Sequence, residues 1–191
     1  MIWNSGPWKD ELERIGTDLD RRRAQRRWTD RSLAIVERSV MVGFYMVRKL
    51  MEARKLSDNY AASRLRLRCH PRSGPIPDPL NWHQLDRFYD LEVTSPAERD
   101  VGFVCNQVVH SFVFVVSADR RGLEGFFVAS DRARSGQLYF MSAESAVSVL
   151  LGAARDDASS WQGVRGRNRR WMPSLASEAP REGSEHPGEP S

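Results

Sequence analysis

The stretch Leu33–Met51, LAIVERSVMVGFYMVRKLM, is the longest apolar-rich run in the sequence. Apolar residues recur along it at steps of three and four, which places them on one face of a helix. They are Leu33, Val36, Val40, Phe44, Val47 and Met51. Between Val40 and Val47 the other faces are apolar too. A helix that is apolar all round is buried on more than one side, so the run predicts a central helix of the core.

A membrane span is the alternative interpretation of this run, and it requires about 20 consecutive residues with few charges. Four charged residues interrupt the stretch, namely Glu37, Arg38, Arg48 and Lys49. We therefore expect a buried helix and no membrane partner.

The residues around the run predict where this helix begins and ends. Thr29 is suited to cap the N-terminus, and Asp30 suits the positive end of the helix dipole. Cations accumulate toward Lys55, near which we expect the helix to end. Gly43 lies mid-helix at a cost of about 1 kcal/mol relative to Ala. We expect it to allow close contact with a second helix rather than to leave room for a ligand.

A second amphipathic helix is predicted before the central one, from about Pro7 to Arg27. Its apolar residues also recur at steps of three and four: Trp8, Leu12, Ile15 and Leu19. The two helices would form a helical hairpin.

After Ser57 the periodicity changes to two. Leu65, Leu67 and Cys69 alternate with arginines, which predicts a half-exposed strand. We interpret the arginines as charges that guard an edge strand. Residues 71–79 hold four prolines and predict a loop.

The segments beyond that loop are less regular. Residues 82–88 predict a short helix and residues 89–93 an extended segment. Residues 95–100 are interpreted as a connection. Residues 101–109 predict a second short helix.

The next segments predict a small sheet. Residues 111–117 are apolar on both faces, which favours a central strand. A hairpin to residues 125–130 and a third strand at 137–141 follow. Ser142 is suited to cap a helix that runs to about Arg155. The expected fold class is α+β, with the helical hairpin packed on a small, mainly antiparallel sheet and a C-terminal helix beside it.

Residues 1–157 are expected to form one domain. Beyond Asp157 the sequence becomes rich in Arg and Gly, then in Pro, Glu and Ser, with little to bury. We therefore predict that residues 158–191 are a disordered tail.

Composition restricts the class of protein only loosely. The chain has 191 residues, 40% of them hydrophobic, and a formal net charge of +4. Only Lys9, Lys49 and Lys55 among its 29 basic residues are lysine. Cys69 and Cys105 are the only cysteines, which suggests a reducing compartment. Because the N-terminus lacks the pattern of a signal peptide, we expect a cytoplasmic protein.

The best candidate for catalysis is the pair Asn106 and His110, which would share a helical face at positions i and i+4. A histidine at the end of an element can act as a general acid or base, and the alternative is that His110 caps the helix or bonds to a backbone carbonyl. This spacing resembles the Arg-polar-x-x-x-His motif of HEPN-type ribonucleases. The resemblance implies an acid–base role for His110. The residue before Asn106 is Cys105, however, so the phosphate-binding Arg of that motif is absent.

Metal and cofactor sites are not indicated by the sequence. His83 and Asp86 at i, i+3 could bind a metal or simply contact one another, and two ligands do not complete a site. We find no glycine-rich phosphate loop, nucleophile elbow or zinc pattern. No metal and no cofactor are therefore expected.

Two arginine clusters are candidates for phosphate contact. The first comprises Arg21, Arg22, Arg23, Arg26 and Arg27, and the second Arg165, Arg167, Arg169 and Arg170. Trp161 and Trp171 flank the second cluster, and aromatic residues among arginines suit stacking on single strands. An Arg-rich composition with solvated charge runs is the alternative.

We hypothesise a binding or accessory protein that contacts nucleic acid through arginine. The alternatives are a small nuclease-like hydrolase that uses His110, and a protein-binding module that uses the helical hairpin.

Overall fold

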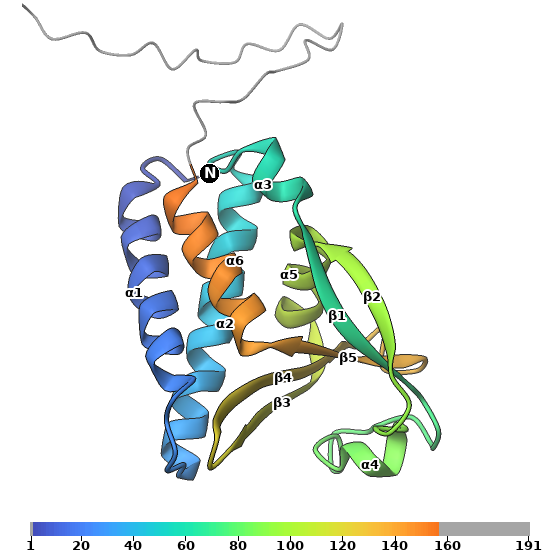
Figure 1. The fold of residues 1–191 in the computed structure, drawn as a ribbon. Coiled ribbons are helices and arrows are strands. Elements are labelled where there is room, and N and C mark those ends of the chain that lie inside the picture. The colour runs from blue at the N-terminus through green and yellow to red at the C-terminus, as the bar shows by residue number, and fades with distance from the viewer. Residues whose placement is uncertain (1, 157–191) are drawn as a thin grey trace, which may run out of the picture. The chain divides into compact units, whose positions relative to one another are not determined.

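The computed structural model describes residues 2–156, in which helices pack on a five-stranded antiparallel sheet (Figure 1). The predicted α+β class is confirmed, with helices at the N-terminus and a last helix after the sheet. The predicted tail, residues 158–191, lies outside the described residues, and so does the second arginine cluster.

Helices α1 (Gly6–Arg22) and α2 (Asp30–Glu52) form the predicted hairpin, and α6 (Ala143–Arg155) packs on both. Thr29 caps α2 as predicted, because its Oγ1 accepts the N–H of Ser32 at 3.2 Å. The Ser32 hydroxyl accepts the Thr29 N–H in return at 2.9 Å, which completes a capping box.

The first helix is shorter than predicted and ends at Arg22 instead of Arg27. The N–H groups of Arg23 and Ala24 bond to carbonyls three residues back, at 3.1 and 3.3 Å. These bonds tighten the last turn into 3₁₀ geometry, and the helix ends there. The segment that follows brings Trp28 to the sheet, where its Nε1–H donates to the Asp119 carbonyl at 3.0 Å.

Gly43 lies where α2 and α6 approach each other closely. A Cβ atom at this position would lie 2.8 Å from Cδ2 of Leu150 and 3.6 Å from Cγ2 of Ile15. Glycine therefore allows contact with α1 and α6, as we expected, and the free-energy cost of a mid-helix glycine is offset by packing.

The central helix is less buried than its composition predicts. Val42 is 43% exposed and Tyr45 is 47% exposed, so one face of α2 carries apolar residues into solvent. The helix is still buried on more than one side, as predicted, because α1, α5, α6 and β3 all pack against it. None of the helices in residues 2–156 has the length and apolar character needed to cross a membrane.

The strands lie in the order β2-β1-β5-β4-β3. They are β1 (Arg64–Pro71), β2 (Ser95–Asp100), β3 (Ser111–Asp119), β4 (Gly122–Ser130) and β5 (Gln137–Ser142). The β3–β4 hairpin and the third strand confirm the predictions, and Ser142 caps α6 by accepting the Ser145 N–H at 3.1 Å.

Three predictions about strands were wrong. Residues 95–100, interpreted as a connection, form the edge strand β2. Because β2 pairs with β1, the arginine-bearing strand β1 is interior rather than an edge. Strand β3 lies at the other edge instead of the centre. Its two apolar faces have another cause, because Phe114 packs into the main core and Val113 into a second cluster on the opposite face.

The remaining helices are short: α3 (Asp58–Ala62), α4 (Leu85–Phe88) and α5 (Val101–Val109). Helix α5 has the predicted bounds, whereas α4 covers only the end of the segment predicted at 82–88. The segment predicted as extended at 89–93 forms a single bridge, between Tyr89 and Arg72.

Different elements pack on the two faces of the sheet. The inner face packs against α2, α5 and α6 around the main core, to which α1 adds side chains by packing on α6 and α2. The outer face is covered at one end by the segment that contains α4, whose side chains form the second cluster with the sheet. That cluster consists of Leu85, Phe88, Tyr89, Val113, Ala129 and Leu138. Beyond this cluster, β1 and β2 present exposed side chains on the outer face.

Candidate functional site

Asn106 and His110 lie one turn apart at the end of α5. Asn106 is half-buried, and its Oδ1 accepts a hydrogen bond from the guanidinium of Arg48 on α2. His110 is exposed and ends the helix, with its N–H donating to the Asn106 carbonyl at 3.1 Å. The structure thus brings an arginine of another helix into contact with Asn106.

Arg48 is held on a second side by Glu52, whose Oε1 lies 2.8 Å from the Arg48 Nε. Arg48 and Lys49 both donate to this carboxylate and lower the pKa of Glu52 to about 2. Sequence reasoning missed Arg48 because 58 residues separate it from Asn106. The strand β3 follows α5 directly, so the fold differs from the all-helical bundle of HEPN-type proteins.

The first arginine cluster is largely paired with acidic residues. Arg21 and Arg22 both donate to Asp18, at 3.1 and 2.8 Å, and Arg23 donates to Asp20 at 2.8 Å. Exposed pairs of this kind contribute little stability, but they reduce the local positive charge. Arg26 and Arg27 are exposed in the segment between α1 and α2.

The other candidates give no metal site. His83 and Asp86 are both exposed. In the part of the chain that the structure describes, no three His, Cys, Asp or Glu side chains are grouped to hold a metal. Cys69 and Cys105 are buried free thiols, and burial raises the pKa of Cys105 to about 12.

A row of arginines on β1 is the most unusual feature of the outer sheet face. Arg64, Arg66 and Arg68 are exposed, whereas Leu67 and Cys69 point to the opposite face and join the main core. Successive arginines lie roughly 7 Å apart, as two residues of a strand require. Because β1 is interior, these charges do not guard an open edge. We call these three residues the arginine row.

The neighbouring strand β2 places one paired carboxylate against the arginine row. Arg66 is registered opposite Glu98, and its Nε lies 3.5 Å from Glu98 Oε1 in an exposed pair. Asp100, opposite Arg64, caps α5 by accepting the Phe103 N–H at 2.7 Å. Within residues 2–156, Arg66 is the one member of the row with an ion pair.

Arg68 is also stacked on an aromatic ring. Its guanidinium carbon lies 4.1 Å from the ring centre of Phe140 on β5, which is registered directly opposite. Phe140 in turn contacts Phe127 of β4, with ring centres 4.8 Å apart. Val115 of β3 is registered opposite Phe127, so this line of side chains continues across four strands.

Gly125 leaves the space on β4 that the Phe140 ring occupies. A Cβ atom at Gly125 would lie 2.7 Å from Cζ of Phe140 and would also overlap the Met141 carbonyl oxygen. Only a residue without a side chain lets the ring lie over β4 at this point. The ring is 5% exposed, covered in part by Arg68, whereas Phe127 is half-buried.

His70 is the next residue of β1 on the same face as the arginine row. Its ring is 3% exposed and lies 5.7 Å from the ring of Phe127. Neither ring nitrogen has a hydrogen-bond partner among the described residues. Burial lowers the pKa of His70 and the charge of Arg68 lowers it further, whereas nearby backbone groups of Asp90, Leu91 and Val93 oppose this shift.

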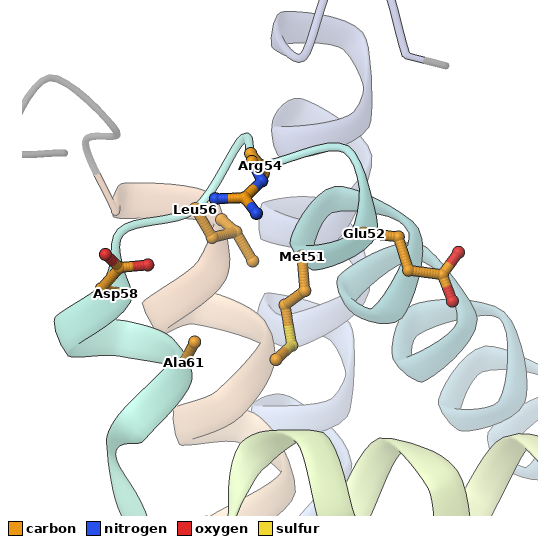
Figure 2. A pocket seen from close by; sticks show the side chains of 6 residues that line it. All are labelled: Met51, Glu52, Arg54, Leu56, Asp58 and Ala61. Atoms are coloured by element: carbon orange, nitrogen blue, oxygen red, sulfur yellow. The ribbon is translucent and has the colours of Figure 1, made fainter. Parts of the chain in front are cut away.

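A pocket of about 370 Å³ lies between the end of α2 and α3 (Figure 2). Its lining residues are Met51, Glu52, Arg54, Leu56, Asp58 and Ala61. Arg54 has a φ of +55°, in the left-handed region that favours glycine, at the turn that ends α2. The pocket contains none of the site residues that the sequence predicts.

No protein-family model matches this sequence, and no curated protein or solved structure matches it either. Function must therefore be inferred from the chemistry of the residues themselves.

Proposed function

We propose that the protein binds nucleic acid and that the arginine row of β1 contacts the phosphates. The observation that carries this proposal is that three exposed arginines share one face of an interior strand. A guanidinium matches the geometry of a phosphate and stays charged at any physiological pH. Interior strands have no edge for charges to protect, so edge protection does not explain the arginine row.

The arginine row is a better phosphate site than the cluster at the end of α1. Arg21, Arg22 and Arg23 already donate to carboxylates of their own helix. In the arginine row, Glu98 is the one paired carboxylate, and its contact with Arg66 is long and exposed. Phosphate binding there displaces one weak pair at most.

The proposal is tested by fluorescence anisotropy of a labelled 20-nucleotide RNA and a 20-base-pair DNA over a salt series. The test variant replaces Arg64, Arg66 and Arg68 with Gln, and the matched control replaces Arg21, Arg22 and Arg23 with Gln. Both variants remove three positive charges. We expect binding that weakens with salt and a larger loss of affinity in the test variant. Equal losses in the two variants, or no binding at low salt, would reject the proposal.

A second candidate function is phosphodiester hydrolysis at His110. The observation that favours it is the Arg48–Asn106 hydrogen bond, because it joins an arginine to the residue one helical turn before His110. An imidazole can transfer protons at neutral pH. Cleavage of labelled RNA that is lost in His110→Ala, with unfolding temperature unchanged, would support this candidate. Equal cleavage by His110→Ala and the unaltered protein would exclude it.

A further inference from the structure

We infer that the outer sheet face takes single-stranded nucleic acid and that a base stacks against Arg68. The inference rests on the proposed function and adds the class of nucleic acid and the mode of contact.

The position of the arginine row argues against a duplex partner. Proteins read a DNA duplex by inserting a helix or a two-stranded ribbon into the major groove. The arginine row instead lies within the sheet, with β2 on one side and β5 on the other (Figure 1). A sheet face suits a single strand that lies along it with its bases unstacked.

Arg68 offers a stacking surface. Its guanidinium carbon lies over the Phe140 ring, 4.1 Å from the ring centre, and Arg68 is nevertheless exposed. The ring contact restrains the guanidinium, so less freedom is lost when a planar group stacks on it. Unstacked bases bind to arginine planes as well as to aromatic rings.

The surroundings of Arg68 divide the face into a phosphate side and a base side. Arg64 and Arg66 continue along β1 from Arg68. Across the sheet from Arg68 lie Phe140 and the half-buried Phe127. A strand that follows β1 would place phosphates over the arginines and turn its bases toward β5 and β4.

The test compares three labelled ligands of equal length: oligothymidylate of 12 nucleotides, an abasic strand of 12 phosphates, and a 12-base-pair duplex. The abasic strand keeps the charges and lacks the bases. We expect the thymidylate to bind about tenfold more tightly than the abasic strand, because the abasic strand has no base to stack against Arg68. We also expect it to bind more tightly than the duplex.

Arg68→Lys keeps the charge and removes the planar group, so it should abolish the preference for thymidylate over the abasic strand. Arg64→Lys is the matched control, because the same change is made in the same row, and it should keep the preference. Circular dichroism establishes that both variants fold.

The experiment distinguishes failure of this inference from failure of the proposed function. Equal affinities for the thymidylate and the abasic strand, or tighter binding of the duplex, would overturn this inference and leave the proposed function standing. The inference would also be overturned if Arg68→Lys kept the full preference. No binding of any of the three ligands would overturn the proposed function and this inference with it.

Discussion

The guanidinium carbon of Arg68 on β1 lies 4.1 Å from the ring centre of Phe140 on β5. These two residues are direct cross-strand partners, and Gly125 on the next strand leaves the space that the ring occupies. A strand that presents arginine to solvent is thereby joined to an aromatic layer within the sheet. At this contact a positively charged side chain lies directly over an aromatic ring on the outer face.

Glu98→Gln should tighten the binding of nucleic acid by about two- to fivefold. The carboxylate pairs with Arg66 at 3.5 Å and competes with phosphate for it, and exposed pairs of this kind contribute about 0.2–1 kcal/mol. Anisotropy titrations of both proteins measure the change. Glu11→Gln is the control, because Glu11 forms a similar exposed pair with Arg14 on α1. An unchanged or weaker affinity in Glu98→Gln would show that Glu98 does not compete.

Gly125→Ala should lower the free energy of unfolding by about 1–3 kcal/mol, the usual cost of overpacking. The added Cβ would overlap the Met141 carbonyl oxygen and the Phe140 ring. Urea unfolding measures the loss. Gly136→Ala is the control, because the nearest atom to its Cβ would be the Ala133 carbonyl oxygen at 3.8 Å. Equal stability of the two variants would contradict the packing described for Phe140.

His70 should make the protein less stable below about pH 6.5. Burial and Arg68 lower the pKa of His70 in the folded state, so the unfolded chain binds the proton more readily. Stability is therefore fully present above the unfolded pKa of about 6.5 and is lost as the pH falls toward the folded pKa. Urea unfolding at several pH values measures the effect.

The variant that isolates this effect is His70→Leu, which removes the titrating group. Its free energy of unfolding should change less between pH 7.5 and pH 5.5 than that of the unaltered protein. His83→Gln is the control, because His83 is exposed. A pH dependence that His70→Leu leaves intact would assign it to other groups.

Cys105 should resist alkylation in the folded protein at pH 8. The thiol is fully buried, and burial raises its pKa to about 12, so the reactive thiolate is scarce. Mass spectrometry after iodoacetamide treatment should find Cys105 unmodified without denaturant and modified in urea. Rapid modification of the folded protein would contradict the burial of α5 against the core.

Local signals predicted much of this fold. Thr29 and Ser142 are caps whose side chains act within three residues, so their roles were visible in the sequence. Helix α5 kept its predicted bounds because the spacing of its apolar residues is also a local signal. Its Asp100 cap was not predicted.

Strand order was not predictable in the same way. The segment SPAERD forms β2 by pairing with β1, although it has no apolar alternation of its own. Its Pro96 is tolerated because β2 is an edge strand. Because this strand was missed, β1 was predicted to be an edge strand and its arginines were interpreted as charges that guard the edge. The observed pairing of β2 with β1 rules out that interpretation.

Contacts between segments far apart in the chain could not be predicted from the sequence either. The Arg48–Asn106 hydrogen bond joins α2 to α5, and the Arg68–Phe140 contact joins β1 to β5. Asn106 and His110 were found because they are four residues apart on one helix. Arg48 carries no local mark that distinguishes it from the other arginines of an Arg-rich chain.

The most direct test of the central claim is the salt dependence of binding to a labelled single strand. For single strands, the slope of log affinity against log salt is about −0.7 per phosphate contact. If Arg64, Arg66 and Arg68 each contact a phosphate, replacing all three with Gln should make the slope shallower by about 2. A slope that the triple variant leaves unchanged would show that the arginine row is not the phosphate-binding surface.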